Sequence, residues 1–120
     1  MTSIVRITMP FPPSLNGVFP TRGNRRVPSP AYRAWRDEAG WTIKAQRPAK
    51  FTTPVHVRID LMPPDGRRRD VDNLAKAPLD ALVAAGVLAD DSLVRRLSIG
   101  WVEIGEPCVV IVSPWESAQG

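Results

Sequence analysis

Side chains that could act together on a phosphodiester are concentrated in residues 60–91. Seven of the twelve acidic residues lie in this segment, although the 120-residue chain carries a net charge of +4. Three consecutive arginines directly precede Asp70, and an Asp-Asp pair closes the segment. The residues concerned are Arg67, Arg68, Arg69, Asp70, Asp72, Asp90 and Asp91. Phosphodiester hydrolysis needs such a mixture, because cations hold phosphate while carboxylates hold a metal ion that activates water.

The carboxylates predict a Mg²⁺ site. Neighbouring carboxylates repel each other unless a cation neutralises them, and Mg²⁺ is usually held by one or two carboxylates together with waters and phosphate oxygens. Asp70 and Asp72 would supply ligands, completed by Asp90 or Asp91. With one histidine and one cysteine in the chain, zinc is a poor competitor. Each acidic residue alone is equally typical of a helix cap, an ion pair or a surface turn; their combination favours a site.

The basic residues indicate phosphate binding. Thirteen of the sixteen are arginine, whose planar guanidinium pairs with phosphate through two hydrogen bonds. Arg22, Arg25 and Arg26 lie in residues 11–30, a proline-rich stretch that reads as a long exposed loop. This loop is either an arm that contacts a phosphate backbone or a merely soluble connection.

The acidic segment is predicted to begin a helix over residues 70–86. Asp70 would cap its first turn, and at 100° per residue Asp72, Asn73, Lys76 and Asp80 would share one exposed face. Pro78 lies inside this pattern, where it removes a backbone hydrogen bond. The sequence therefore predicts a kink near Lys76, or a tight first turn followed by a redirected helix.

The remaining elements read as an α/β (α+β) fold with a mixed sheet of about four strands and two main helices. Apolar alternation predicts strands over residues 3–10, 55–61, 93–104 and 108–113. The last two are expected to form an antiparallel pair around the turn of residues 105–107. Ser29-Pro30 predicts the start of a helix over residues 30–46, and residues 1–120 are expected to form one domain.

Several residues receive plain interpretations. Tyr32, Trp35, Ala39 and Ile43 form the core stripe of the first helix, whereas Trp41 falls on the opposite face as a candidate subunit or ligand contact. His56 is expected on the polar side of its strand without a catalytic or metal role. Cys108 is expected to be a buried free thiol. No membrane span or signal pattern is present, and a cytoplasmic location is expected.

The residues RRRDVDNLAKAPLDAL, followed by LADDSLV, resemble the core of the RusA family of Holliday junction resolvases. The leading strand with its PPS loop and the strand VHVRIDLMPPD also match. The resemblance implies a RusA-like, Mg²⁺-dependent, homodimeric endonuclease of bacterial or prophage origin, which cuts two opposed strands of a four-way DNA junction in recombination and repair. The essential carboxylates would be Asp70, Asp72 and Asp91, and the active-site lysine would be Lys76. Arg67 to Arg69 match the family's basic run.

Two other functions stay open at this point. One is a non-catalytic nucleic-acid-binding module whose carboxylates only balance the local arginine charge. The other is a Mg²⁺-dependent nuclease that acts on flaps, other branched DNA or RNA.

Overall fold

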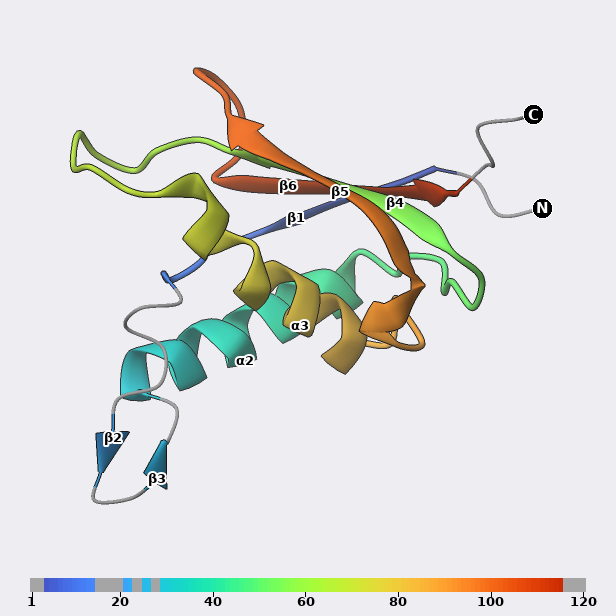
Figure 1. Cartoon of the computed structure of the whole chain (residues 1–120), viewed down its shortest axis with the longest axis horizontal. Coiled ribbons are helices and arrows are strands. Elements are labelled where there is room, and N and C mark those ends of the chain that lie inside the picture. The colour runs from blue at the N-terminus through green and yellow to red at the C-terminus, as the bar shows by residue number, and fades with distance from the viewer. Residues whose placement is uncertain (1–3, 15–20, 23–24, 27–28, 116–120) are drawn as a thin grey trace.

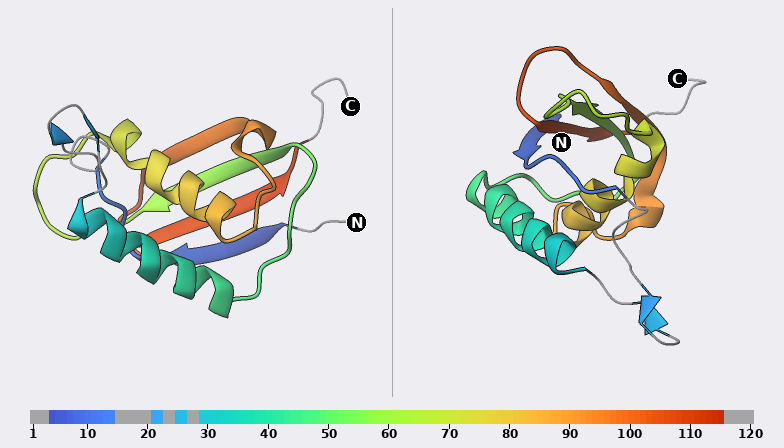
Figure 2. Two further views of the ribbon diagram at one scale, coloured as in Figure 1. Left: turned by 90° about the horizontal axis from the view of Figure 1, so that it is seen from below. Right: turned by 90° about the vertical axis from the view of Figure 1, so that its left-hand side faces the viewer.

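The computed structural model describes residues 4–14, 21–22, 25–26 and 29–115. Four strands form one sheet: β1 (Val5–Met9), β4 (Val55–Leu61), β5 (Val94–Trp101) and β6 (Cys108–Pro114). The helices α2 (Pro30–Ala45) and α3 (Lys76–Ala84) lie over the same face of that sheet (Figures 1 and 2). The predicted α+β fold with four sheet strands and two main helices is confirmed.

The sheet has the spatial order β1-β6-β4-β5. β6 pairs antiparallel with both β1 and β4, whereas β4 pairs in parallel with β5. β5 and β6 are therefore not neighbours, and the prediction that they form an antiparallel pair is wrong. β6 is almost continuously apolar and takes a central position, while β5 carries Arg95 and Arg96, as is common on an edge strand.

The first helix forms as its sequence predicts. The Ser29 hydroxyl accepts a 3.0 Å hydrogen bond from the Tyr32 amide, and Pro30 occupies the first turn, where its missing N–H is not needed. The predicted stripe of Tyr32, Trp35, Ala39 and Ile43 is buried. It packs with alternate residues of β4, which are fully buried on the side facing the helices: Val55, Val57, Ile59 and Leu61.

The second helix differs from its prediction. A short 3₁₀ helix, η1 (Val71–Leu74), comes first, and α3 starts anew at Lys76. The ring of Pro78 would clash with the carbonyl of Leu74 in one continuous helix. After the break Pro78 lies in the first turn of α3, where its missing N–H costs no intrahelical bond. The single helix over residues 70–86 is thus wrong, and the predicted tight first turn before the helix is confirmed.

The loop expected over residues 11–30 contains a short hairpin. β2 (Thr21–Arg22) pairs antiparallel with β3 (Arg25–Arg26), and the hairpin stands away from the sheet in the right-hand view of Figure 2. The rest of this loop from residue 15 to residue 28 lies outside the described residues. Among the described helices, none combines the length and apolar character that a membrane span requires.

The strand directions bring distant segments to one end of the sheet. β1, β4 and β5 run in the same direction, so Met9, Leu61 and Trp101 mark one common end. The chain leaves β4 there through residues 62–70, and η1 and α3 then return it to the start of β5 through η2 (Asp91–Leu93). This connection between two parallel strands carries the residues from Arg67 to Asp91 that are expected to act on phosphate.

Candidate active site

Asp70 directly precedes η1 and Asp72 lies within it, in the connection that follows β4. Asp70 occupies the position before the helix, but its side chain makes no capping hydrogen bond, contrary to expectation; its carbonyl accepts 3.1 Å from the Asn73 amide instead. Both carboxylates are exposed. None of the ion pairs among the described residues involves them, so both remain available to a cation.

Lys76 and Asp72 do not belong to one helix. Asp72 and Asn73 lie in η1, whereas Lys76 and Asp80 lie in α3, so the predicted common face on one continuous helix is wrong. Lys76 instead pairs with Asp80 one turn later, with 3.0 Å between Nζ and Oδ1. The Asp80 hydrogen bond raises the pKa of Lys76, and the charge of Asp91 raises it further. Lys76 is therefore a firmly charged ammonium group that lies in the electrostatic reach of Asp91.

Asp90 and Asp91 have different roles in the turn before β5. The Asp90 carboxylate accepts 3.0 Å from the Ser92 amide and caps η2, which lowers the pKa of Asp90. Asp91 is exposed in the first position of η2. Asp90 is thus engaged by the backbone, whereas Asp91 is the carboxylate left for a ligand role.

The described residues do not form a ready-made cage of three metal ligands. Among the described residues, no three histidine, cysteine or acidic side chains converge as a metal site. Exposed aspartates on η1 and η2 still fit Mg²⁺ in their chemistry, since it needs only one or two carboxylates when waters and substrate phosphates supply the other oxygens.

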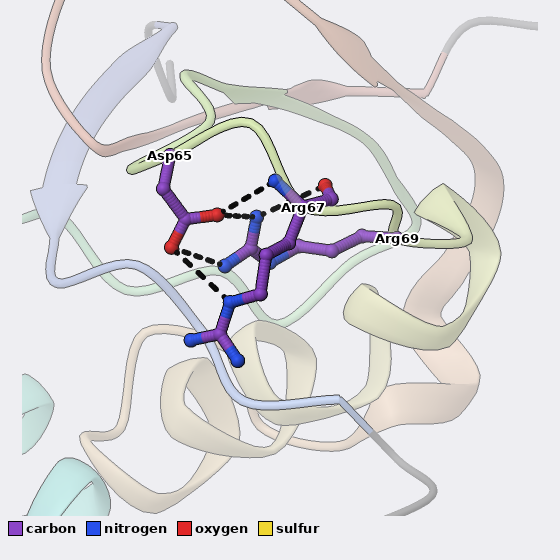
Figure 3. Close-up of polar contacts among 3 residues, drawn as sticks. All are labelled: Asp65, Arg67 and Arg69. Atoms are coloured by element: carbon purple, nitrogen blue, oxygen red, sulfur yellow. Dashed lines mark hydrogen bonds and ion pairs between the residues drawn. The ribbon is translucent and has the colours of Figure 1, made fainter.

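The arginine triplet is organised by an acid that the sequence analysis did not single out. Asp65 accepts from Arg69 through both oxygens, at 2.9 and 3.1 Å, and from the amide of Arg67 at 2.9 Å (Figure 3). Its Oδ2 also lies 3.5 Å from Nε of Arg67. The Arg69 hydrogen bonds hold the pKa of Asp65 well below its usual range. Arg68 is exposed and forms no ion pair within the described part of the chain.

Arg69 also joins an aromatic stack at this end of the sheet. Its guanidinium carbon lies 5.4 Å from the centroid of the Phe11 ring, and Phe11 stacks on Trp101 at 6.2 Å with an interplanar angle of 11°. The Asp65 to Arg69 spacing of i,i+4 was the only signal in the sequence for part of this cluster. Phe11 and Trp101 are too far apart in the chain for any local pattern to connect them.

The other candidate residues fall as follows. The backbones of Arg22, Arg25 and Arg26 lie in the β2–β3 hairpin, and their side chains are outside the described part. Trp41 is 77% exposed, as predicted. His56 sits on the polar side of β4, 3.0 Å from the Ser98 hydroxyl, as expected of a surface histidine. Cys108 is a buried free thiol, and its burial raises its pKa to about 12.

Comparisons with known proteins show the family of this chain. The family described as endodeoxyribonuclease RusA matches residues 10–112. The chain is 43% identical over 89 residues to the crossover junction endodeoxyribonuclease RusA of Escherichia coli K12, covering 73% of this chain and 74% of the relative. The enzyme of the same name from Enterobacteria phage 82 is 42% identical over the same shares. The chain belongs to the endodeoxyribonuclease RusA family.

Proposed function

We propose that this protein is a Mg²⁺-dependent crossover junction endodeoxyribonuclease that resolves Holliday junctions by cutting two opposed strands, in DNA recombination and repair. The observation that carries the proposal is that the connection from β4 to β5 exposes three carboxylates without ion pairs, Asp70, Asp72 and Asp91, and also carries a charged lysine and an arginine run. Relatives at 42–43% identity bear the name of this activity. A cytoplasmic location is part of the proposal, because the relatives come from a bacterium and a phage and the proposed substrate is DNA.

Asp70, Asp72 and Asp91 would hold the metal ion. A bound divalent cation supplies a water of lowered pKa and neutralises charge on the scissile phosphate. These carboxylates would supply the protein oxygens for such an ion, and phosphate oxygens of the DNA would supply further ligands. Mg²⁺ is the proposed ion because this donor set consists of carboxylates alone, with no nitrogen or sulfur ligand.

Lys76 contributes positive charge where negative charge accumulates. Asp80 holds its ammonium group at 3.0 Å and keeps it protonated. Such a fixed charge stabilises the crowded phosphate oxygens or the leaving oxygen in the transition state, because it needs no reorganisation during the reaction. Arg67, Arg68 and Arg69, with Arg22, Arg25 and Arg26 of the hairpin, are proposed to contact the phosphates of the DNA arms, so affinity should fall steeply as salt rises.

The proposed enzyme is a homodimer. A four-way junction presents two equivalent strands, and a two-fold dimer meets that symmetry by offering one site to each strand. Trp41, with its large exposed indole on α2, is a candidate contact between subunits. Light scattering on the purified protein tests this part of the proposal, and a monomeric mass at the concentrations used for cleavage would count against it.

One cleavage experiment separates the candidate functions. Labelled four-way junction, flap, linear duplex and RNA–DNA hybrid are each incubated with the wild type, with Asp72→Asn, and with Asp37→Asn, which changes an exposed aspartate of α2 far along the chain from the site. Mg²⁺-dependent paired cuts in the junction, lost in Asp72→Asn and kept in Asp37→Asn, are expected. Cleavage of flaps or hybrids in preference would indicate a different nuclease, and binding without cuts would indicate a non-catalytic module.

A further inference from the structure

A pocket of about 300 Å³ opens beside the arginine run, at the end of the sheet where β4 and β5 finish. Its lining residues are Pro63, Asp65, Gly66, Arg67, Arg69 and Trp101. The hydrolysis proposed above uses neither the indole nor the space in front of it. The pocket therefore calls for a ligand of its own.

The indole of Trp101 offers this pocket a flat aromatic surface. Trp101 is 40% exposed, and Phe11 supports it in a nearly parallel stack, 6.2 Å between centroids. Phe11 does not line the pocket, so the indole also presents surface that Phe11 does not cover. Across the pocket, a Cβ added at Gly66 would meet no heavy atom within 4 Å, which shows that this wall is open. A planar ring is the ligand shape that such a surface accommodates.

The rim of the pocket carries positive charge in two different forms. Arg69 is held by both oxygens of Asp65 and covers the Phe11 ring, with only 19% of its side chain exposed. Arg67 has 82% of its side chain exposed and a looser 3.5 Å contact to the same carboxylate. Two guanidinium groups and one carboxylate leave the rim net positive. Arg69 is fixed in the wall, while Arg67 has the freedom to meet an anion.

A flat ring joined to an anion describes a nucleotide, and the place of the pocket indicates which one. Arg69 is followed directly by Asp70, so the rim borders the carboxylates proposed to act on the scissile phosphate. Bases inside a duplex are stacked and paired, and extracting one is costly. Bases at the branch point of a junction lack a complete stack and can be extruded at lower cost.

We propose that this pocket binds one unpaired nucleobase from the branch point of the junction, stacked against Trp101, with its phosphate on Arg67. The inference rests on the proposed function, because the ligand is a part of the junction substrate. Binding of this base would fix the position of the branch point relative to the proposed cutting site, which phosphate contacts alone do not do.

The test is a double-mutant cycle between protein and DNA. Junctions carrying one abasic nucleotide at each position around the branch point are bound in EDTA by the wild type, Trp101→Ala, Trp101→Phe and Trp115→Ala. Trp115 is a matched control, since it is 36% exposed and its ring also carries an arginine contact, at 5.9 Å from Arg96. Trp115 follows β6 near Pro54, at the opposite end of β4.

Trp101→Ala should weaken junction binding by about 5- to 140-fold, since stacking of a base on an aromatic side chain contributes about 1–3 kcal/mol. One abasic position should weaken wild-type binding to a similar extent and have no further effect in Trp101→Ala. Trp101→Phe should keep most of the affinity, and Trp115→Ala should behave as wild type. Thermal unfolding of each variant checks that it is folded.

The outcomes separate this inference from the function on which it rests. If the wild type cuts junctions but every abasic effect is additive with Trp101→Ala, the base pocket is refuted and the nuclease stands. A Trp101→Ala variant that binds like wild type has the same meaning. Loss of dimer mass in Trp101→Ala, with unchanged affinity per dimer, would assign the pocket to a subunit contact instead. If the wild type neither prefers nor cuts junctions, both proposals fall.

Discussion

Replacing Lys76 by alanine tests the proposed chemistry most directly, because it removes charge from the site with little disturbance of the fold. The Lys76 side chain is 51% exposed, and its 3.0 Å pair with Asp80 spans one turn of α3. Exposed pairs of this spacing stabilise a helix by about 0.3–0.5 kcal/mol, and alanine recovers a part of that through its helix propensity. The free energy of unfolding is therefore expected to fall by less than about 0.5 kcal/mol.

The effect on cleavage should be much larger. Removing one charged or hydrogen-bonding group that stabilises a transition state slows catalysis by about 10²–10³-fold, which corresponds to about 2.7–4 kcal/mol. The expected change in the activation barrier thus exceeds the expected change in stability by at least about fivefold. Single-turnover cleavage of a synthetic four-way junction with excess enzyme and Mg²⁺ measures the first quantity, and urea unfolding measures the second.

Lys44→Ala is the matched control for this experiment. Lys44 is an exposed lysine in the last turn of α2, so its removal changes the net charge by the same amount as removal of Lys76. The favourable interaction of Lys44 with the helix end is comparable in size to the exposed Lys76–Asp80 pair. It should cut junctions at close to the wild-type rate. If Lys76→Ala cuts within about threefold of Lys44→Ala, the catalytic role of the ammonium group is refuted. A slow variant that has also lost about 2 kcal/mol of stability would point to a structural role instead.

Three further outcomes follow from the fold and the site. Ile59→Ala, which opens a hole in the fully buried centre of β4, should lower the free energy of unfolding by about 2–5 kcal/mol in urea titrations; a loss below 1 kcal/mol would contradict the packing. Cys108, buried and with its pKa raised to about 12, should resist iodoacetamide at pH 8 until denaturant is added, as mass spectrometry can follow. Because the folded-state pKa of Asp65 is depressed by Arg69, its contribution to stability is fully present above the ordinary carboxyl pKa of about 4 and is lost as pH falls further. The stability difference between wild type and Asp65→Asn should therefore be constant above about pH 5 and shrink in acid, and a difference independent of pH would refute the pairing.

The candidate residues of the site were accessible from the sequence, but their partners were not. Asp70, Asp72 and Lys76 stand out by type and spacing, as does the Asp90-Asp91 pair, of which the family resemblance selects Asp91. The structure leaves Asp70, Asp72 and Asp91 exposed. Their spatial relation was misjudged because it was projected on one continuous helix. Because Pro78 cannot continue the first turn as an α-helix, α3 starts anew after η1. Lys76 therefore pairs with Asp80 within α3, whereas Asp72 lies in η1.

The division between sequence and tertiary structure follows the range of the interactions. Alternating apolar residues suffice to define β1 and β4, and Ser29-Pro30 with its buried stripe suffices to define α2, because each pattern depends on neighbours within a few residues. Strand order does not have that property. Whether β6 pairs with β5 or with β4 depends on which pairing buries more apolar surface once the helices have covered one face. In the structure β6 pairs with β4.

The pocket beside the site is the clearest product of the tertiary structure. Four side chains meet because β1, β4 and β5 all finish at the same end of the sheet: Phe11, Asp65, Arg69 and Trp101. No local pattern encodes that meeting, since it results from the strand directions and the crossover through α3. The sequence by itself determined that arginines suited to phosphate and carboxylates suited to a metal ion are present; the packing of the sheet decided which flat surface lies near them.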